Sequence, residues 1–147
     1  MKEEVLPSFI RDLQESLSVS VKTTPLEIDF SKPSIIICSE SSVIEKRGKE
    51  FFLKSDKKNQ HYTPDINKLF TSFAKYEMNF DMNVLIMTGI GNDGVEGAAL
   101  LKSKGAKVFA QDEKRSPVYG MPKAACERGI VDKVLSLDEI KVYLQSL

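Results

Sequence analysis

The sequence predicts an α/β fold with a mostly parallel, doubly wound sheet, helices on both of its faces and a small β-hairpin. Short apolar runs of strand length alternate with amphipathic stretches of helical length in the second half of the chain, and this alternation is typical of parallel sheets. A glycine-rich turn joins one such strand to one such helix, as expected for a crossover between parallel strands. At 147 residues, the chain has the size of a single domain.

The charge and hydropathy of the chain exclude several functional classes. It carries 21 basic and 21 acidic side chains, which are scattered along the sequence, so it offers no electrostatic surface for nucleic acid or anionic lipid. No run approaches the roughly 18 apolar residues of a membrane-spanning helix, and the acidic N-terminus does not resemble a signal peptide. We therefore expect a cytoplasmic protein without a nucleic-acid partner and without membrane insertion.

Residues that hold metals are scarce. The chain has one histidine, His61, and two cysteines, Cys38 and Cys126, each among apolar residues. This set supplies neither a disulfide framework nor a four-ligand zinc site. We expect two free, buried thiols, no metal and no organic cofactor.

The first third of the chain predicts one helix and two strands. Apolar residues recur at steps of three and four over residues 5–17, which predicts an amphipathic helix with Pro7 in its first turn. Alternation of apolar and polar residues over 17–21 predicts a half-buried strand. The continuous apolar run 34–38 predicts a strand covered on both faces.

A hairpin and a second helix are expected next. Segments 43–46 and 50–53 flank Gly48 and predict two strands joined by a tight turn, and polar residues 54–60 predict a flexible loop. The dipeptide Thr63-Pro64 has the residue types of an N-cap followed by the first helical residue. The apolar stripe of this helix consists of Ile66, Leu69, Phe70 and Phe73.

The second half of the chain predicts three strands and three helices. The expected strands are 84–87, 107–111 and 131–135, and the expected internal helices are 95–104 and 121–128. Gly105 and Gly129 directly follow the two internal helices, where glycine favours termination. Ser136 and Glu139 form a capping box that begins the terminal helix.

The glycine-rich turn allows two interpretations. Gly89, Gly91 and Gly94 follow a strand and precede a helix, and Asp112 ends the next strand, which fits the dinucleotide-binding fingerprint. In that interpretation pyrophosphate approaches main-chain N–H groups and Asp112 binds a ribose hydroxyl, although Asp93 in the same turn would repel the phosphate. In the structural interpretation, Asp93 caps a helix and the glycines provide tight-turn geometry.

The position of the site follows from topology under either interpretation. Ligands of open parallel sheets bind outside the carboxyl ends of the strands. We expect the glycine turn, residues 111–113 and the segment before Met121 to converge there.

Several spaced motifs extend the pattern beyond this fingerprint: Thr88-Gly-Ile-Gly-Asn-Asp-Gly94 with Gly97, Gly105-Ala106, Ala110-Gln-Asp-Glu113, Ser116, and Tyr119-Gly-Met-Pro122 with Ala125. In this order they resemble the catalytic domain of the chemotaxis protein-glutamate methylesterases, the CheB family. The similarity is clear over 84–135 and looser back through 64–70 to the opening helix. It implies a Rossmann-like domain that hydrolyses glutamate γ-methyl esters on methyl-accepting chemotaxis receptors, often with deamidation of receptor glutamines, through a Ser-His-Asp triad.

The resemblance implies roles for specific residues. Asp93 matches the triad aspartate, which accepts a hydrogen bond from the histidine, fixes its tautomer and stabilises the imidazolium. Ile90 falls at the position whose main-chain N–H belongs to the oxyanion site, between Gly89 and Gly91. Gly120, Met121 and Pro122 would line the substrate side of the cleft. The alternative for these three is a plain helix entrance, with Met121 in the core and Pro122 at the first helical position.

The other two triad members have no match in the chain. In the family, the serine turn and the histidine precede the position that matches residue 1, so we expect residues 1–147 to form a single catalytic domain that is N-terminally incomplete. His61, Ser39, Ser41 and Ser42 do not replace them, because we expect these residues in solvated loops and no glycine provides a strained nucleophile turn. Without upstream strands, bare sheet edges are expected to make the isolated chain unstable, swapped or aggregated.

Two rival hypotheses for the function remain open. One is a catalytically inactive domain that docks on chemoreceptor helices through the same cleft. The other is a dinucleotide-binding module that uses the glycine turn and Asp112.

Overall fold

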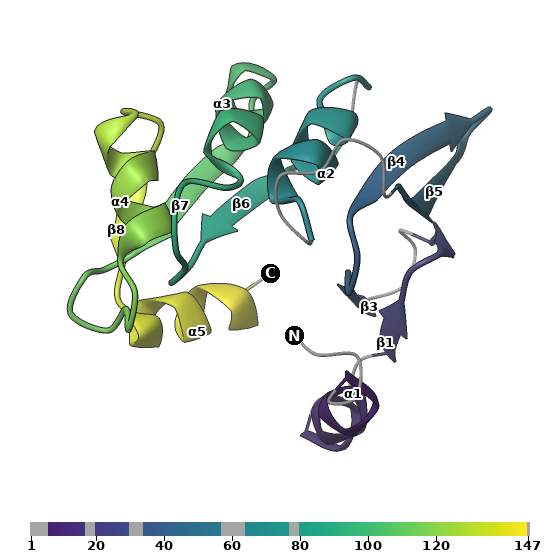
Figure 1. The fold of residues 1–147 in the computed structure, drawn as a ribbon, viewed down its shortest axis with the longest axis horizontal. Coiled ribbons are helices and arrows are strands. Elements are labelled where there is room, and N and C mark those ends of the chain that lie inside the picture. Colours follow the sequence, from purple (N-terminus) through teal and green to yellow (C-terminus); the bar gives the residue numbers. More distant parts are fainter. Residues whose placement is uncertain (1–5, 17–19, 30–33, 57–63, 77–79, 147) are drawn as a thin grey trace.

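The computed structural model describes residues 6–16, 20–29, 34–56, 64–76 and 80–146, and these contain helices and strands in the expected alternation (Figure 1). In chain order they are α1 (Leu6–Ser16), β1 (Ser20–Thr23), β2 (Leu26–Ile28), β3 (Ser34–Ile37), β4 (Ser42–Arg47), β5 (Glu50–Ser55), α2 (Ile66–Phe73), β6 (Asn83–Ile86), α3 (Val95–Ser103), β7 (Lys107–Gln111), α4 (Gly120–Glu127), β8 (Lys133–Leu135) and α5 (Leu137–Gln145).

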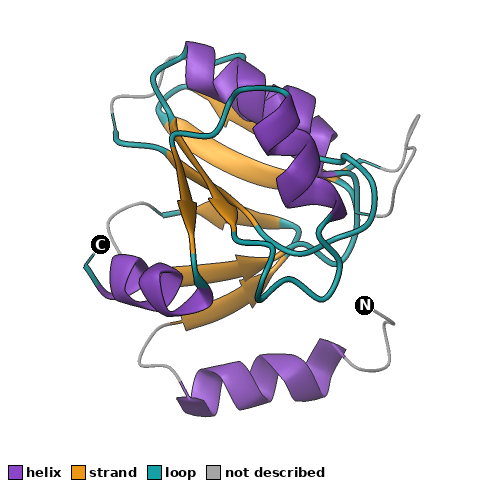
Figure 2. Ribbon diagram, turned by 90° about the vertical axis from the view of Figure 1, so that its left-hand side faces the viewer, coloured by secondary structure: helices purple, strands orange, loops and turns teal. Residues whose placement is uncertain are grey.

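A parallel sheet of β6, β7 and β8 confirms the predicted α/β class. Its strands lie in the order β6-β7-β8, with Val84 opposite Val108 in the register. Helices α3 and α4 cover one face and α5 covers the other (Figures 1 and 2). Side chains alternate accordingly: Val108 is fully buried in the core formed with α3 and α4, whereas the ring of Phe109 packs on Tyr143 of α5 at 4.8 Å.

Two smaller sheets form the other half of the fold. Strands β1 and β3 pair in parallel, and β2, β5 and β4 form an antiparallel sheet. Among the described residues, the parallel strands are thus divided between two sheets, and the small antiparallel sheet contains the predicted hairpin. β2 was not anticipated, because its three residues carry too short an alternation to predict a strand. β3 was expected to be covered on both faces, but all of its residues are only half-buried.

The predicted hairpin is confirmed, with longer strands than expected. Arg47 pairs with Glu50 across a tight turn in which Gly48 has a φ of 62°. Lys54 and Ser55 belong to β5 and not to the loop expected from residue 54. The inner face of this sheet forms a second core of Ile44, Phe51 and Leu53, which packs against Leu69 and Phe73 of α2.

The start of α2 differs from the prediction. Asp65 is the N-cap, and its carboxylate accepts a hydrogen bond from the Lys68 N–H at 2.8 Å. The expected cap, Thr63, lies outside the described residues, and Pro64 precedes the helix. The aspartate is favoured because its short side chain can reach an N–H of the first helical turn.

The other helix ends follow the expected chemistry. Both hydrogen bonds of the capping box are present between Ser136 and Glu139. Gly105 and Gly129 have φ values of 97° and 72°, in the left-handed region that favours glycine after a helix. Among the described residues, no helix has the length and apolar character that crossing a membrane requires.

Helix α1 is held less closely than the other helices. It packs on β1, where the Gln14 amide donates to the Val21 carbonyl at 3.4 Å, and it lies apart from the other helices (Figure 2). Its apolar side chains are half-buried or exposed, and Phe9 is 38% exposed. An amphipathic helix with so much open apolar surface gains little free energy from its own packing.

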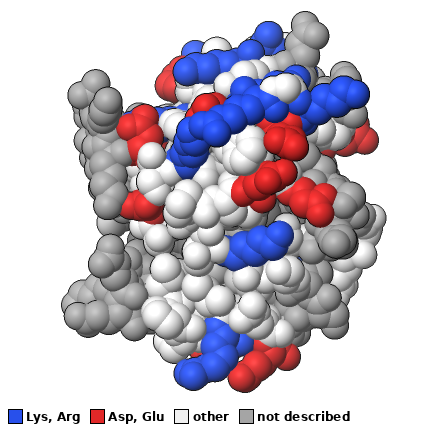
Figure 3. Space-filling view, turned by 90° about the vertical axis from the view of Figure 1, so that its right-hand side faces the viewer, with Lys and Arg blue, Asp and Glu red and all other residues white. Residues whose placement is uncertain are grey.

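Surface charge and cysteines also bear on the predictions. On the face that carries the hairpin, basic and acidic side chains are interspersed (Figure 3), and the Arg47 Nε pairs with a Glu45 carboxylate oxygen at 2.9 Å.

Cys38 and Cys126 are free, as expected, but they are half-buried and not buried. Partial burial raises the pKa of the Cys38 thiol.

The segment before β8 generates a prediction about acid stability. The Asp132 carboxylate accepts hydrogen bonds from the Lys102 ammonium and the Val108 N–H, both at 2.7 Å. The bond from Lys102, followed by the one from Val108, holds the pKa of Asp132 below its ordinary value. A lowered pKa in the folded state adds stability above about pH 4, which is lost as the pH falls through the lowered value.

We therefore expect Asp132→Asn to lower the urea midpoint at pH 7, and the difference from the unaltered protein to shrink as the pH falls toward about 3. The measurement is urea unfolding between pH 7 and pH 3. The control is Glu127→Gln, which removes a carboxylate whose ion pair within the described residues is with the exposed Lys123 at 3.8 Å. A difference for Asp132→Asn that stays constant with pH would contradict the linkage.

Candidate functional site

The predicted convergence at the carboxyl ends of the strands is confirmed by main-chain contacts. The turn after β6 lies beside the segment that leads into α4. The Gly89 N–H donates to the Val118 carbonyl and the Met121 N–H donates to the Gly89 carbonyl, each at 2.9 Å. Gly89 and Tyr119 form a parallel bridge. Two segments about 30 residues apart are thereby locked edge to edge.

The side chains of Gln111 and Thr88 make hydrogen bonds that hold these two segments together. Gln111 is 2% exposed; its Oε1 accepts from the Thr88 N–H at 3.0 Å and its Nε2 donates to the Arg115 carbonyl at 2.8 Å. The Thr88 hydroxyl donates to the Val118 carbonyl and accepts from the Val118 N–H, both at 3.0 Å. The sequence did not predict the hydrogen bonds of Gln111, because a polar residue at the end of a strand does not indicate which distant group it will bind.

Gly89 and Gly120 lie where the two segments of the site approach each other closely. A Cβ on Gly120 would lie 2.7 Å from the Gly89 oxygen and 2.9 Å from the Gly91 nitrogen. A Cβ on Gly89 would overlap the sulfur of Met121. The contact at Gly120 is with main-chain atoms, so the two segments can make their hydrogen bonds only because this position lacks a side chain. At Gly89 the contact is with the flexible side chain of Met121.

The predicted oxyanion position is open to solvent. Ile90 is 81% exposed, and none of the described residues accepts a hydrogen bond from its N–H. Gly91, with a φ of 80°, is also exposed. A main-chain N–H that has no acceptor among the described residues is able to bind an oxygen from outside them.

The predicted substrate residues begin α4. Gly120 is its first residue, Met121 is half-buried, and Pro122 is fully buried. Pro122 is the third helical residue and not the first, which corrects the helix-entrance alternative; a proline is tolerated there because N–H groups of the first turn have no partner within the helix.

Asp93 is the buried carboxylate of the site. It is 4% exposed, and its oxygens accept three main-chain hydrogen bonds: Oδ2 from the Ile66 N–H at 2.8 Å, and Oδ1 from the Asn67 and Gly94 N–H groups at 3.0 and 2.9 Å. Ile66 and Asn67 begin α2, so Asp93 caps a helix whose first two residues lie 27 and 26 residues before it in the chain. It does not cap α3, whose N-cap is Gly94 with no side-chain hydrogen bond.

The structure argues against a dinucleotide at this turn. A Cβ on Gly94 would lie 2.9 Å from Cγ2 of Ile66, and a Cβ on Gly97 would lie 2.5 Å from Cβ of Phe70. These glycines admit α2, and not a pyrophosphate, to the start of α3. Asp112 accepts a hydrogen bond from the Arg115 N–H at 3.2 Å within its own loop.

Two serines differ from their prediction. Ser41 and Ser42 were expected in a solvated loop, but both are at most 1% exposed. The Ser41 hydroxyl accepts from the Asp65 N–H at 2.9 Å, and the Ser42 hydroxyl donates to the Glu40 carbonyl at 2.9 Å.

His61 lies outside the described residues. In the part of the chain that is described, no three or more His, Cys, Asp and Glu side chains gather to hold a metal.

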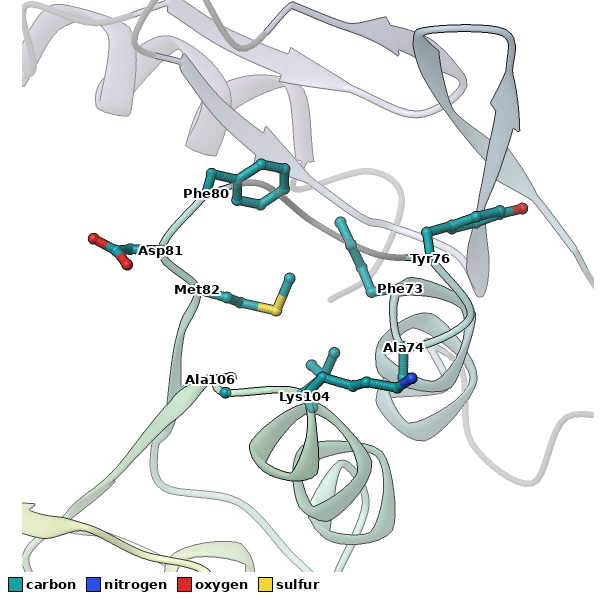
Figure 4. Close-up of a pocket in the computed structure, with 10 residues that line it drawn as sticks. Phe73, Ala74, Tyr76, Phe80, Asp81, Met82, Lys104 and Ala106 are labelled. Carbon is teal, nitrogen blue, oxygen red and sulfur yellow. The ribbon is translucent and has the colours of Figure 1, made fainter.

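A cavity of about 310 Å³ lies at the opposite ends of the strands, between the last turns of α2 and α3 and the start of β6 (Figure 4). Its labelled lining residues include Phe73, Tyr76, Phe80, Met82 and Lys104. Its lining contains no residue of the candidate site, so the cavity and the site are separate.

Comparison with known proteins identifies the family. A family model described as CheB methylesterase matches residues 1–144. The chain belongs to this family. It is 32% identical to the protein-glutamate methylesterase/protein-glutamine glutaminase of Alkalilimnicola ehrlichii, over 100% of this chain and 38% of that protein. It is 31% identical to protein-glutamate methylesterase/protein-glutamine glutaminase 1 of Saccharophagus degradans, over 95% of this chain and 39% of that protein.

A solved structure supports the same conclusion. The catalytic domain of Thermotoga maritima CheB methylesterase matches with a TM-score of 0.78 and 25% identity, over 98% of this chain and 78% of that one. The predicted resemblance to CheB catalytic domains is confirmed. The chain spans about two fifths of the length of the curated relatives, so the activity of the whole protein is a matter for proposal.

The close approach at Gly120 generates a prediction for this CheB-type domain. Gly120→Ala should destabilise the domain by about 1–3 kcal/mol, because the new Cβ must displace main-chain atoms of Gly89 and Gly91. Lys123→Ala, on the exposed side of the same helix, should stay within about 0.5 kcal/mol. Urea unfolding of both variants measures the difference, and equal midpoints would contradict the tight contact.

Proposed function

We propose that the natural protein containing this chain hydrolyses glutamate γ-methyl esters on methyl-accepting chemotaxis receptors in the cytoplasm, and deamidates receptor glutamines at the same site. The observation that carries this proposal is Asp93, a buried carboxylate held by main-chain N–H groups. It lies in the same turn as Ile90, whose N–H has no acceptor among the described residues. The relatives that share this domain are named protein-glutamate methylesterase/protein-glutamine glutaminase, which supports the same reaction.

The hydrogen bonds of Asp93 suit the role of triad aspartate. A carboxylate has about four acceptor positions. Main-chain N–H groups use both acceptor positions of Oδ1 and one of the two on Oδ2. Oδ2 can therefore accept one more hydrogen bond. The described residues bring no Lys or Arg ion pair to this carboxylate, so its charge can stabilise an imidazolium.

We propose that the serine and the histidine belong to a segment outside residues 1–147, so that this chain is an incomplete catalytic domain. The matched Thermotoga maritima domain extends beyond the part that this chain covers, which is 78% of it. Within the described residues, β6 pairs with β7 on one side only. A parallel strand added at the other edge of β6 would end beside Thr88 and Gly89, next to the candidate site.

The proposed chemistry is acyl transfer in two steps. The serine hydroxyl attacks the ester carbonyl while the histidine takes its proton, and the oxyanion is stabilised by main-chain N–H groups, among them that of Ile90. The histidine returns the proton to the leaving methoxide, so methanol departs. Water, activated by the same histidine, then releases the glutamate and restores the serine. With a glutamine substrate the leaving group is ammonia.

The first test of this function is the change Asp93→Asn in the complete natural protein. We expect kcat for methanol release from methylated receptor to fall by about 10³–10⁴-fold, because the histidine loses its orienting carboxylate. The control is Asp112→Asn, the same change at the end of the neighbouring strand, which should stay within about threefold. Circular dichroism and the Tm of each variant establish that it is folded.

The outcomes of this test separate the rival functions. Full activity in Asp93→Asn would remove Asp93 from the triad. Receptor binding by the unaltered protein without methanol release would favour the docking domain instead.

The second test concerns the oxyanion position. Ile90→Ala keeps the main-chain N–H and removes only a side chain that is 81% exposed, so kcat should change by less than about threefold. The measurement is again methanol release at saturating receptor. A loss of about 100-fold would mean that the Ile90 side chain itself, and not its main chain, acts in the reaction.

A further inference from the structure

The N-termini of α2 and α3 are capped by each other. Asp93, which precedes α3, accepts from the first two N–H groups of α2, those of Ile66 and Asn67. In the other direction, the side-chain Oδ1 of Asn67 accepts from the Gly97 N–H in the first turn of α3 at 2.9 Å. We call this arrangement the crossed cap.

The crossed cap meets a physical need of α3. The first N–H groups of a helix have no partner within the helix and must be satisfied from outside. The N-cap of α3 is Gly94, which has no side chain to do this. Because Gly97 lies against Phe70 and Asn67, the nearest acceptor for its N–H is the side chain of Asn67 on the neighbouring helix.

Helix α2 is a firm base for this contact. Its N-cap Asp65 donates its own N–H to the buried Ser41 hydroxyl at 2.9 Å and accepts from Lys68 at 2.8 Å. On its inner side, the buried Ser72 hydroxyl accepts from the Ile44 N–H of β4 at 2.8 Å. α2 is thus held by the hairpin sheet, and the crossed cap transmits its position to the turn that carries Asp93.

We propose that Asn67 is a positioning residue for Asp93. Asn67 contacts both partners: its N–H holds Oδ1 of Asp93, and its side chain holds the start of α3 through Gly97. Loss of the side-chain oxygen lets α3 move away from α2 and lengthens the bonds from Ile66 and Asn67 to the carboxylate. Asp93 then no longer presents Oδ2 in the orientation that the histidine requires. The inference rests on the proposed function.

The test compares three variants of the complete natural protein. Asn67→Ala removes the acceptor oxygen, and Asn67→Asp keeps an oxygen of the same reach at a helix N-terminus, where negative charge is favoured. Ser136→Ala is the matched control, because it removes a helix cap from α5, far from Asp93 in the chain. Loss of a cap should lower the Tm by a few degrees, about equally in Asn67→Ala and Ser136→Ala.

We expect Asn67→Ala to lower kcat for methanol release by about 10–100-fold with KM changed by less than about threefold, because a small misplacement of a catalytic group costs up to about 100-fold. The acid limb of kcat/KM should move to lower pH, since a displaced carboxylate stabilises the imidazolium less. Asn67→Asp should recover kcat to within about fivefold. Ser136→Ala should keep both kcat and the pH profile.

Other results would overturn the inference. If Asn67→Ala matches Ser136→Ala in kcat and pH profile, or if Asn67→Asp is no better than Asn67→Ala, Asn67 is only structural. If Asn67→Ala does not fold, Asn67→Ser, whose hydroxyl is too short to reach Gly97 equally well, takes its place in the comparison. Failure of the proposed function has a different signature, namely an unaltered protein without methanol release or an active Asp93→Asn variant.

Discussion

The Asp93 carboxylate accepts hydrogen bonds from three main-chain N–H groups, and these bonds constrain the position of every segment of the site. A buried carboxylate is costly unless hydrogen bonds replace its lost hydration, and here the replacement comes from the start of α2 and from Gly94. A helix N-terminus is a favourable place for negative charge because free N–H groups and the helix dipole both point toward it. The turn after β6 and the helix α2 must therefore be placed together, although they are well separated in the chain.

This constraint explains why so much of the site is main chain. For α2 to reach Asp93, it must lie directly on the start of α3, where Gly94 and Gly97 leave room for Ile66 and Phe70. On the other side of the turn, Gly89 and Gly120 allow two segments to join edge to edge. In the turn that results from this packing, Ile90 is 81% exposed, and none of the described residues accepts a hydrogen bond from its N–H.

The local signals of the sequence were reliable wherever a short range of residues decides the structure. Strand β7, the glycines after α3 and α4, and the capping box of Ser136 and Glu139 were all predicted and are all present. Predictions failed where a residue far away in the chain determines the local structure. Asp65 caps α2 with the help of Ser41, and neither that pairing nor the burial of Ser41 and Ser42 is visible from neighbours in the chain. β2 is a strand chiefly because β5 lies beside it.

The same division applies to the candidate site. The resemblance of the spaced motifs indicated the CheB family and implied the role of Asp93, which stays a prediction. Residue types and spacing by themselves placed the glycine turn at the carboxyl ends of the strands, because this depends on strand order and on turn chemistry. They could not show that Asp93 caps α2 and not α3, that Gly94 and Gly97 make room for a helix and not a phosphate, or that Asn67 completes a crossed cap. Those features depend on which helices come into contact, and a contact between helices is a property of the packed chain that no short stretch of sequence contains.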